Sequence, residues 1–337
     1  MIPHNRPTIG EPEAAAAAQV INSGYLVGGE QTRQFENDMC DFLGLPAGHA
    51  LCVTSGSSAL YIALKVLALA HKTVAMPGYV CSSLQHACAL NQSKPLYLDN
   101  QAGLPIPQFD GQSFDGLIYP YLYGLSSYLP SQPKPVIEDL AQALGAKVDG
   151  QMLGTMGTVG VLSFYATKLM TSGGQGGMLV STDASLIAAA RDYIEFDQRQ
   201  DNFARFNFHI TEMQAAIGRV QLQRLPEFIE QRQQRWQIYR DAGLPLLDIV
   251  DTADNSLSHV RYRAVVTCQQ PQRLIDVLKA QDVSAINPFD VSELLSTDCP
   301  NALALCQQTV SLPLYPTLGI DDCKRIADIA AEVITTP

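Results

Sequence analysis

The chain has 337 residues, of which 47% are hydrophobic and 16% charged, and its formal net charge is −11. These values describe a packed globular protein rather than a disordered one, and they disfavour nucleic acid and anionic membranes as partners, because both bind a basic surface. No apolar stretch reaches the roughly 18–20 residues that span a bilayer, and the N-terminus lacks an apolar signal core. We therefore expect a cytoplasmic protein with two lobes.

Eight cysteines and six histidines are scattered along the chain, without a Cys-x-x-Cys pair and without metal-ligand spacing. In a reducing compartment the thiols are expected to be free and mostly buried. A zinc site is not expected.

Helical and strand-like segments alternate over the first two thirds of the chain. Helices are expected at 11–21, 32–43, 59–67 and 82–90, and strands at 50–53, 73–76, 95–98, 117–121, 135–139, 160–165 and 177–181. Strands separated by helices imply a mostly parallel sheet with helices on both faces, which is a three-layer α/β/α fold.

From about residue 185 the chain becomes mainly helical, with expected helices at 211–224 and 226–240. A strand candidate at 259–267 and a helix at 321–333 predict a smaller lobe. We place the large domain at residues 1–235 and a small C-terminal α/β domain at residues 236–337.

Lys168 is the most informative residue. It follows Ser163 by five residues, lies within the apolar segment 164–170, and precedes a glycine cluster at 173–177. Lysines are mostly exposed, whereas a desolvated amine is easily deprotonated and becomes nucleophilic, as Schiff-base chemistry requires. A lysine at a strand end that reaches water is the alternative, and this segment alone does not decide between the two.

The turn Ser55-Gly56-Ser57-Ser58 lies between a strand and a helix. Backbone amides at a helix N-terminus, with hydroxyls beside them, form an anion site, and Gly56 allows close approach of a ligand. Taken alone, the turn is more typical of a simple serine N-cap.

Glu138 and Asp139 end an apolar strand, where ligands gather in open α/β sheets. A carboxylate there can keep a ring nitrogen protonated. Side chains alternate along a strand, so the two acids face opposite sides, and one of them should be a surface or capping residue. Gln142, one helical turn after Asp139, could face the same pocket.

The order of these motifs resembles pyridoxal-phosphate enzymes of the aspartate-aminotransferase fold, fold type I. It is most similar to the DegT/DnrJ/EryC1/StrS aminotransferases, which mostly act on nucleotide-linked keto-sugars. The resemblance runs nearly end to end, over segments 24–29, 35–36, 55–60, 137–145, 163–177, 207–218 and 312–316.

The resemblance implies a role for each matching residue. Lys168 would form the Schiff base with the cofactor and shuttle the proton, and Asp139 would pair with the pyridine nitrogen. The other implied cofactor contacts are Gly56, Ser57 and Ser163 at the phosphate, Gln142 at the ring or its 3-hydroxyl, Cys81 over the ring, and Asn207 at the phosphate of a neighbouring subunit. The last contact implies a homodimer with shared active sites.

Some positions depart from the family pattern. Cys81 stands where the family often places an aromatic ring over the cofactor, and Tyr79 is the alternative cover. Tyr121, His209 and Gln175 replace a histidine, an arginine and a glutamate that are common in the family. These changes touch the substrate side more than the cofactor side, so they leave the substrate open.

The resulting hypothesis is a two-step transamination. Glutamate or glutamine gives up the amino group, and a keto-sugar, expected to be linked to a nucleotide, takes it up. A sugar dehydratase of the same family is a rival, but those enzymes have histidine in place of Lys168. A non-catalytic cofactor-binding regulator and an aminotransferase acting on a free sugar or another small ketone stay open.

Overall fold

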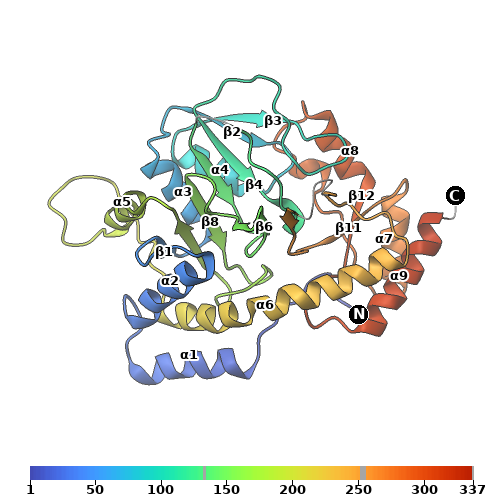
Figure 1. Cartoon of the computed structure of the whole chain (residues 1–337), viewed down its shortest axis with the longest axis horizontal. Coiled ribbons are helices and arrows are strands. Elements are labelled where there is room, and N and C mark those ends of the chain that lie inside the picture. The colour runs from blue at the N-terminus through green and yellow to red at the C-terminus, as the bar shows by residue number, and fades with distance from the viewer. Residues whose placement is uncertain (132–133, 251–255, 336–337) are drawn as a thin grey trace.

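A computed structural model describes residues 1–131, 134–250 and 256–335. A seven-stranded sheet runs through the large lobe in the order β1-β9-β8-β5-β4-β2-β3 (Figure 1). Its strands are β1 (Ala50–Val53), β2 (Thr73–Pro77), β3 (Lys94–Leu98), β4 (Gly116–Pro120), β5 (Val136–Asp139), β8 (Val159–Ser163) and β9 (Gly177–Val180). Neighbouring strands from β8 to β3 are parallel, and β9 is antiparallel to both β8 and β1. The prediction of a mostly parallel sheet is confirmed.

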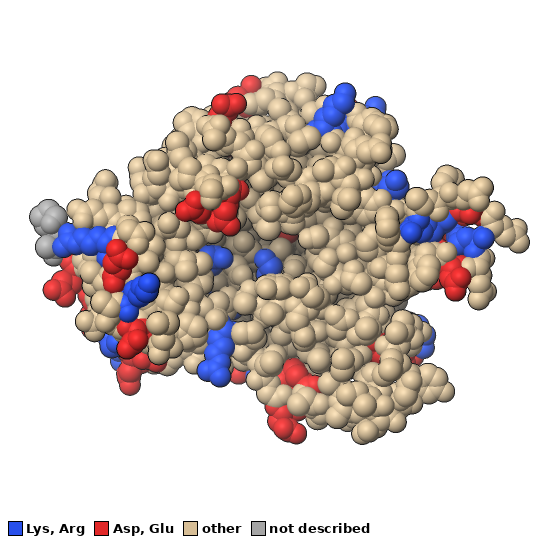
Figure 2. Space-filling view, turned by 180° about the vertical axis from the view of Figure 1, so that it is seen from behind, with Lys and Arg blue, Asp and Glu red and all other residues tan. Residues whose placement is uncertain are grey.

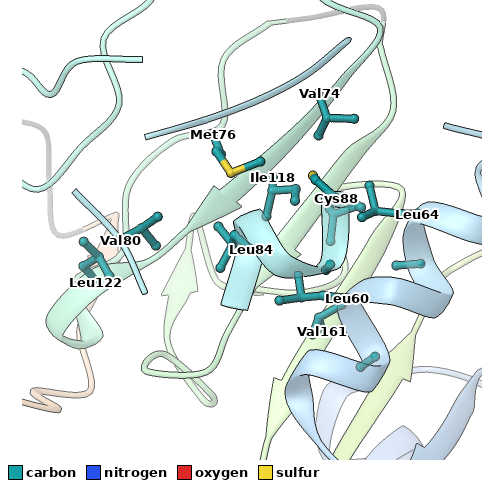
Figure 3. Close-up of a cluster of buried hydrophobic side chains, with 14 of the residues drawn as sticks. Leu60, Leu64, Val74, Met76, Val80, Leu84, Cys88, Ile118, Leu122 and Val161 are labelled. Carbon is teal, nitrogen blue, oxygen red and sulfur yellow. The ribbon is translucent and has the colours of Figure 1, made fainter. Parts of the chain in front are cut away.

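Helices cover both faces of this sheet, as the alternation along β1 illustrates. Leu51 and Val53 belong to the core under α3 (Gly56–Val66), α4 (Ser83–Leu90) and α5 (Ala184–Ile194), part of which is drawn in Figure 3. Ala50 and Cys52 face the opposite core, under α2 (Glu30–Leu43) and α6 (Glu212–Asp241). The α1 helix (Glu11–Ser23) packs on α6. The three-layer α/β/α class is therefore confirmed.

The two helices expected at 211–224 and 226–240 form one helix, α6, which continues through Pro226. An internal proline removes one backbone hydrogen bond and strains the preceding turn. The helix persists because it is buried along its length, with Leu225 in the core of the large lobe and Trp236 in that of the small lobe. The expected domain boundary at residue 235 lies inside this helix and stays a prediction.

The small lobe is built on a core of its own around Trp236 and Tyr239. Its elements are β11 (Ala264–Thr267), α7 (Pro271–Ala280), α8 (Pro300–Gln308), β12 (Thr309–Leu312) and α9 (Ile320–Thr335), with β11 and β12 antiparallel. The start of the chain also lies here, because Ile2 pairs with Val283 and packs on this core. Short elements complete the chain: β6 (Lys147–Val148), β7 (Gln151–Met152), β10 (Leu257–Ser258) and 3₁₀ turns at Leu122–Gly124 and Val291–Glu293.

Among the described residues, no helix combines the length and the apolar character needed to cross a bilayer. Nor do the His, Cys, Asp and Glu side chains of this part of the chain form a group that could hold a metal ion. The cysteines are buried except for exposed Cys81 and half-buried Cys268, so the expectation of mostly buried thiols is confirmed.

Candidate active site

A cavity of about 360 Å³ opens where β4, β5 and β8 end and α3 begins. Figure 2 shows a hollow near the middle of one face, with lysine or arginine atoms visible inside it. The residues lining the cavity include Gly56, Ser57, Cys81, Asp139, Gln142, Ser163 and Lys168 from the large lobe and Tyr262 and Arg263 from the small lobe. Every candidate site residue predicted from the sequence except Asn207 thus meets in one cavity.

The first turn of α3 contains Gly56 and Ser57, where the sequence predicts an anion site. Ser55 is indeed the N-cap, because its Oγ accepts a hydrogen bond from the Ser58 amide at 3.1 Å. The next two amides, of Gly56 and Ser57, belong to the helix turn that lacks intrahelical acceptors, and both residues line the cavity. The N-cap and the anion site are therefore compatible readings of the same turn.

Close packing brings Ser163 against this turn. A Cβ atom placed on Gly56 would lie 2.9 Å from the Ser163 Cβ, closer than side chains normally approach. Similarly, a Cβ on Gly177 would lie 2.3 Å from the Ser55 carbonyl carbon. Glycine is therefore required at both positions for the Ser163 hydroxyl to stand beside the first amides of α3.

Glu138 and Asp139 face opposite sides of the sheet, as strand alternation predicts. Glu138 points away from the cavity and caps a turn: its Oε1 accepts from the Met156 and Gly157 amides, and its Oε2 accepts from the Gly154 amide and the Tyr121 hydroxyl. Glu138 is fully buried, so of the two expectations, surface or capping, only capping is correct.

Asp139 is the carboxylate of the cavity. Its Oδ1 accepts a hydrogen bond from the Ala141 amide at 2.9 Å. Burial raises the pKa of Asp139 above its ordinary value, and the Ala141 amide and the charge of Lys168 oppose this rise only in part. A cationic or protonated partner in the cavity would stabilise this carboxylate, because removal from water disfavours its charged form.

Lys168 enters the cavity from the loop after β8 and is half-buried. Its loop is fixed at several points: the Lys168 amide donates to the Tyr165 carbonyl at 2.9 Å, and the Asn5 side chain donates to the Thr167 carbonyl at 2.9 Å. The Nζ lies 5.6 Å from the centroid of the Tyr262 ring. The lysine therefore points into the cavity rather than along an open surface.

The Tyr262 ring lies beside this amine. Burial would raise the pKa of Tyr262, but the charges of Lys168, Arg263 and Arg232, with a hydrogen bond from Thr167, lower it below its ordinary value. Tyr262 thus stands in a strongly positive environment.

Cys81 and Gln142 also reach the cavity. The Gln142 Oε1 accepts from the Tyr123 amide at 2.7 Å, which leaves its NH₂ group as the donor. Tyr79, the alternative to Cys81, is fully buried, with its hydroxyl 2.5 Å from that of Tyr123 and its ring 4.7 Å from that of Phe289. Tyr79 is therefore committed to the core, and Cys81 is the one of the two that lines the cavity.

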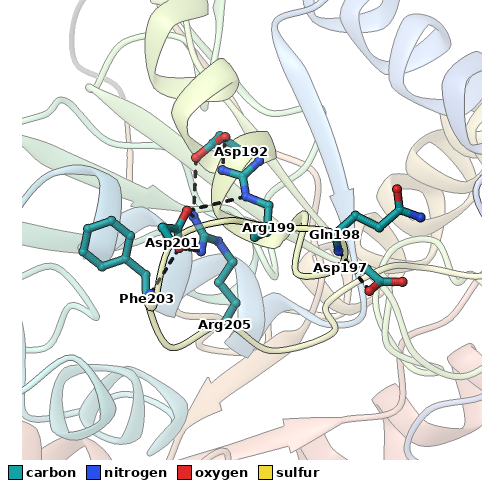
Figure 4. A network of polar contacts seen from close by, with 7 residues as sticks. All are labelled: Asp192, Asp197, Gln198, Arg199, Asp201, Phe203 and Arg205. Carbon is teal, nitrogen blue, oxygen red and sulfur yellow. Dashed lines mark hydrogen bonds and ion pairs between the residues drawn. The ribbon is translucent and has the colours of Figure 1, made fainter.

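Asn207 lies outside the cavity of its own chain. It is exposed, and its Oδ1 accepts from the His209 amide at 3.0 Å. It belongs to the segment after α5, which projects from the body of the molecule in Figure 1. Ion pairs of Arg199 and Arg205 with Asp192 and Asp201 hold this segment in shape (Figure 4).

The other three departures from the family pattern, after Cys81, take different places. Tyr121 and Gln175 line the cavity. His209 does not; its ring lies 6.0 Å from that of Phe196 in the projecting segment.

Tyr262 and Arg263 were missed by the sequence reasoning, which identified residues 259–267 only as a strand. Two arginines flank Tyr262 just before the apolar run of β11, and this grouping of charges at a strand end is the signal that could have indicated a binding site.

The model of the DegT/DnrJ/EryC1/StrS aminotransferase family matches residues 7–104 and 131–330. The chain belongs to this family. The fold is the one that the resemblance implied, and membership makes the protein an aminotransferase-family enzyme.

Characterised relatives match over almost their whole length. The UDP-N-acetyl-3-dehydro-alpha-D-glucosamine 3-aminotransferase of Acidithiobacillus ferrooxidans is 24% identical, over 92% of this chain and 90% of the relative. The GDP-perosamine synthase of Vibrio cholerae is also 24% identical, over 97% of this chain and 98% of the relative. The crystal structure of the aminotransferase TlmJ from Streptoalloteichus hindustanus superposes with a TM-score of 0.89 at 25% identity, covering 100% of both chains.

Proposed function

We propose that this family member is a pyridoxal-phosphate-dependent aminotransferase, which moves an amino group from glutamate or glutamine to a nucleotide-linked keto-sugar. The observation that carries the proposal is the convergence of the Lys168 amine and the Asp139 carboxylate in one cavity, next to the N-terminus of α3.

The residues present fit this cofactor. The amides of Gly56 and Ser57 and the Ser163 hydroxyl form a cradle for a phosphate, which favours a helix N-terminus. Asp139 is a buried carboxylate in need of a cationic partner, as a protonated ring nitrogen provides. Cys81 would cover the ring and Gln142 would donate to its 3-hydroxyl. Pyridoxal phosphate, when bound, supplies the electron sink that amino transfer needs.

The chain itself supplies the proton transfers. Lys168 Nζ would take a proton from the substrate carbon that bears the amino group. It would then return a proton on the cofactor side of the transferred nitrogen, acting as general base and then as general acid. Asp139 would hold the proton on the ring nitrogen. The Tyr262 ring, with its centroid 5.6 Å from Nζ, and Arg263 form the side of the cavity beside this amine.

Relatives support a sugar acceptor. A further relative, the dTDP-4-dehydro-2,3,6-trideoxy-D-glucose 4-aminotransferase of Saccharopolyspora spinosa, is 25% identical over 97% of this chain and 95% of the relative. Its name and that of the relative from Acidithiobacillus ferrooxidans describe keto-sugars, and that of the relative from Vibrio cholerae describes an amino sugar. The three sugars are carried on three different nucleotides. Their disagreement over the nucleotide and the aminated carbon leaves both for substrate screening.

A homodimer is part of the proposal. Large apolar side chains are exposed at Tyr25, Leu26 and Val27 and again at Phe203 and Phe206, beside Asn207. Exposed aromatic side chains in such groups are typical of interfaces. A second copy seated there would bring Asn207 to the phosphate cradle of its partner.

The test is an absorbance spectrum of the purified protein with pyridoxal phosphate, before and after addition of L-glutamate or L-glutamine. We expect a visible band that the donor removes, and covalent attachment of the cofactor at Lys168 after borohydride reduction, located by peptide mass spectrometry. Lys168→Ala should show neither, whereas the exposed-lysine control Lys324→Ala should behave as wild type.

The possible results separate the alternatives. A band that no amino donor removes would favour a binding or regulatory protein. If amino donors remove the band and only free keto-sugars, not nucleotide-linked ones, restore it, the acceptor is a free sugar. Absence of the band, with Lys168 unmodified, would contradict the proposal.

A further inference from the structure

Arg263 lies in the wall of the active-site cavity, and its guanidinium has no hydrogen-bond or ion-pair partner within the described part of the chain. It lies immediately before β11 and lines the cavity together with Lys168. Its Nε and Nη1 are both buried, and neither has a hydrogen-bond partner among the described residues. Burying a charged donor without a partner is costly, so a ligand is the expected partner.

Neighbouring arginines have protein partners for at least part of their guanidinium groups. Arg261 forms an ion pair with Asp248 and stacks 3.7 Å from the centroid of the Trp236 ring. Arg232 donates from Nη1 to the carbonyls of Tyr262 and Leu314 at 3.0 and 2.8 Å. The Nε of Arg232, like that of Arg263, has no hydrogen-bond partner in the described part of the chain. Arg263 differs from both neighbours because no atom of its guanidinium forms a hydrogen bond or ion pair with the described residues.

Tyr79 and Tyr123 do not neutralise Arg263. Burial raises the pKa of the nearby Tyr79 to about 12 even beside the positive charge of Arg263, so Tyr79 stays neutral at physiological pH. Burial also raises the pKa of Tyr123, to which Tyr79 is hydrogen-bonded. An anion that enters the cavity would meet an uncompensated guanidinium.

Arg263 and Lys168 flank the same ring. The Arg263 Cζ lies 5.7 Å and the Lys168 Nζ 5.6 Å from the centroid of Tyr262. Both side chains also line the same cavity, so a ligand that reacts at Lys168 can present an anionic group to Arg263. The α-carboxylate of an amino acid is such a group.

The diphosphate of a nucleotide sugar fits this place less well. A sugar ring separates it from the keto carbon, and the cavity of about 360 Å³ must also hold the cofactor. The planar fork of arginine, in turn, matches a carboxylate. We propose that Arg263 binds the carboxylate of the amino donor and thereby selects amino acids as donors. This inference rests on the proposed aminotransferase function.

A binding measurement tests it without turnover. The probe is glutarate, the dicarboxylate that remains when the amino group of glutamate is removed, titrated by calorimetry into cofactor-loaded wild type, Arg263→Gln and Arg263→Lys. We expect Arg263→Gln to weaken glutarate binding at least about tenfold, because a charged hydrogen-bond partner is lost, and Arg263→Lys to fall between. Arg325→Gln, an equal charge change on the surface of α9, should bind as wild type.

Two further titrations identify the source of the anion. Affinities for pyridoxal phosphate and for uridine diphosphate should be the same in wild type and Arg263→Gln. Unchanged glutarate binding in Arg263→Gln, no glutarate binding by wild type, or a larger loss of uridine diphosphate binding would each overturn the assignment.

Donor discrimination provides a second readout. Wild type should react much faster with L-glutamate than with 4-aminobutyrate, which lacks the α-carboxylate, and Arg263→Gln should lose most of this preference. Failure of wild type to bind pyridoxal phosphate would instead refute the proposed function, and is detected before any variant is compared.

Discussion

Asp139 and Lys168 reach one cavity from the ends of two neighbouring parallel strands, β5 and β8. Because parallel strands end at the same edge of a sheet, these residues, 29 positions apart in the sequence, meet there: Asp139 is the last residue of β5, and Lys168 lies in the loop that follows β8. The lysine carries a positive charge toward a carboxylate whose pKa burial raises. The sheet thus positions a carboxylate and an amine in one cavity, where a ring cofactor bound between them would contact both.

Asp139→Asn tests the acid. We expect turnover to fall on the order of 10²-fold or more, because the ring nitrogen loses its charged partner. Cofactor binding should persist, since the phosphate cradle and Lys168 are intact. Steady-state kinetics combined with the visible band measure the two effects, and full turnover in Asp139→Asn would contradict the role given to Asp139.

The same variant has a predicted effect on stability in the cofactor-free protein. Between the ordinary pKa of Asp139 and its raised value, the folded protein holds a proton that the unfolded chain has released, so wild-type stability falls as pH rises through this window. Above the window the loss is complete. Asp139→Asn should therefore melt higher than wild type at pH 7, and the difference should vanish below about pH 3.9. An equal or lower melting temperature at pH 7 would contradict this account.

Glu138→Gln should damage stability rather than catalysis. Each carboxylate oxygen of Glu138 accepts from at least one backbone amide, so the glutamine NH₂ must face an N–H in either orientation. We expect a loss of about 1–3 kcal/mol in the free energy of unfolding, for a buried donor left unsatisfied. Turnover per folded molecule should be near wild type, because the side chain points away from the cavity. The exposed control Glu195→Gln should leave the denaturation midpoint unchanged, and a Glu138→Gln protein of normal stability that is inactive would contradict this assignment.

Much of the fold could be predicted because short apolar runs and their interruptions are local signals. The extent of α6 could not, since the penalty at Pro226 is visible in the sequence and the compensating burial of Leu225 and Trp236 is not. The pairing of Ile2 with Val283 is equally non-local.

The candidate site shows the same division. Strand alternation correctly placed Glu138 and Asp139 on opposite faces. The backbone amides that donate hydrogen bonds to Glu138, however, come from a turn 16 to 19 residues later in the sequence. Arg261 and Arg263 look equivalent by alternation, yet the left-handed backbone of Arg261 (φ 48°) breaks the strand pattern there. One arginine pairs with Asp248 and the other lines the cavity, which the sequence pattern could not distinguish.

Gly56→Ala tests the contact between α3 and Ser163. The new Cβ would approach the Ser163 Cβ to 2.9 Å, so we expect a loss of about 1–3 kcal/mol in stability from overpacking and weaker binding of pyridoxal phosphate. Adding Ser163→Gly removes the opposing Cβ and should recover part of the stability, while the missing hydroxyl keeps cofactor affinity low. A double-mutant cycle by chemical denaturation measures this coupling, and simple additivity would contradict the contact.

Shared active sites make a prediction about mixed dimers. Lys168→Ala and Asn207→Ala should each be inactive or weak at limiting cofactor concentration. A hybrid of the two variants contains one site with both residues intact, because Lys168 comes from one subunit and Asn207 from the other, and one site that lacks both. Random mixing of the two subunits should therefore restore roughly a quarter of wild-type activity, as half of the dimers are hybrids with one working site. Activity of the mixture no higher than the average of the two pure variants, with hybrid formation verified by two affinity tags, would place Asn207 outside the partner's site.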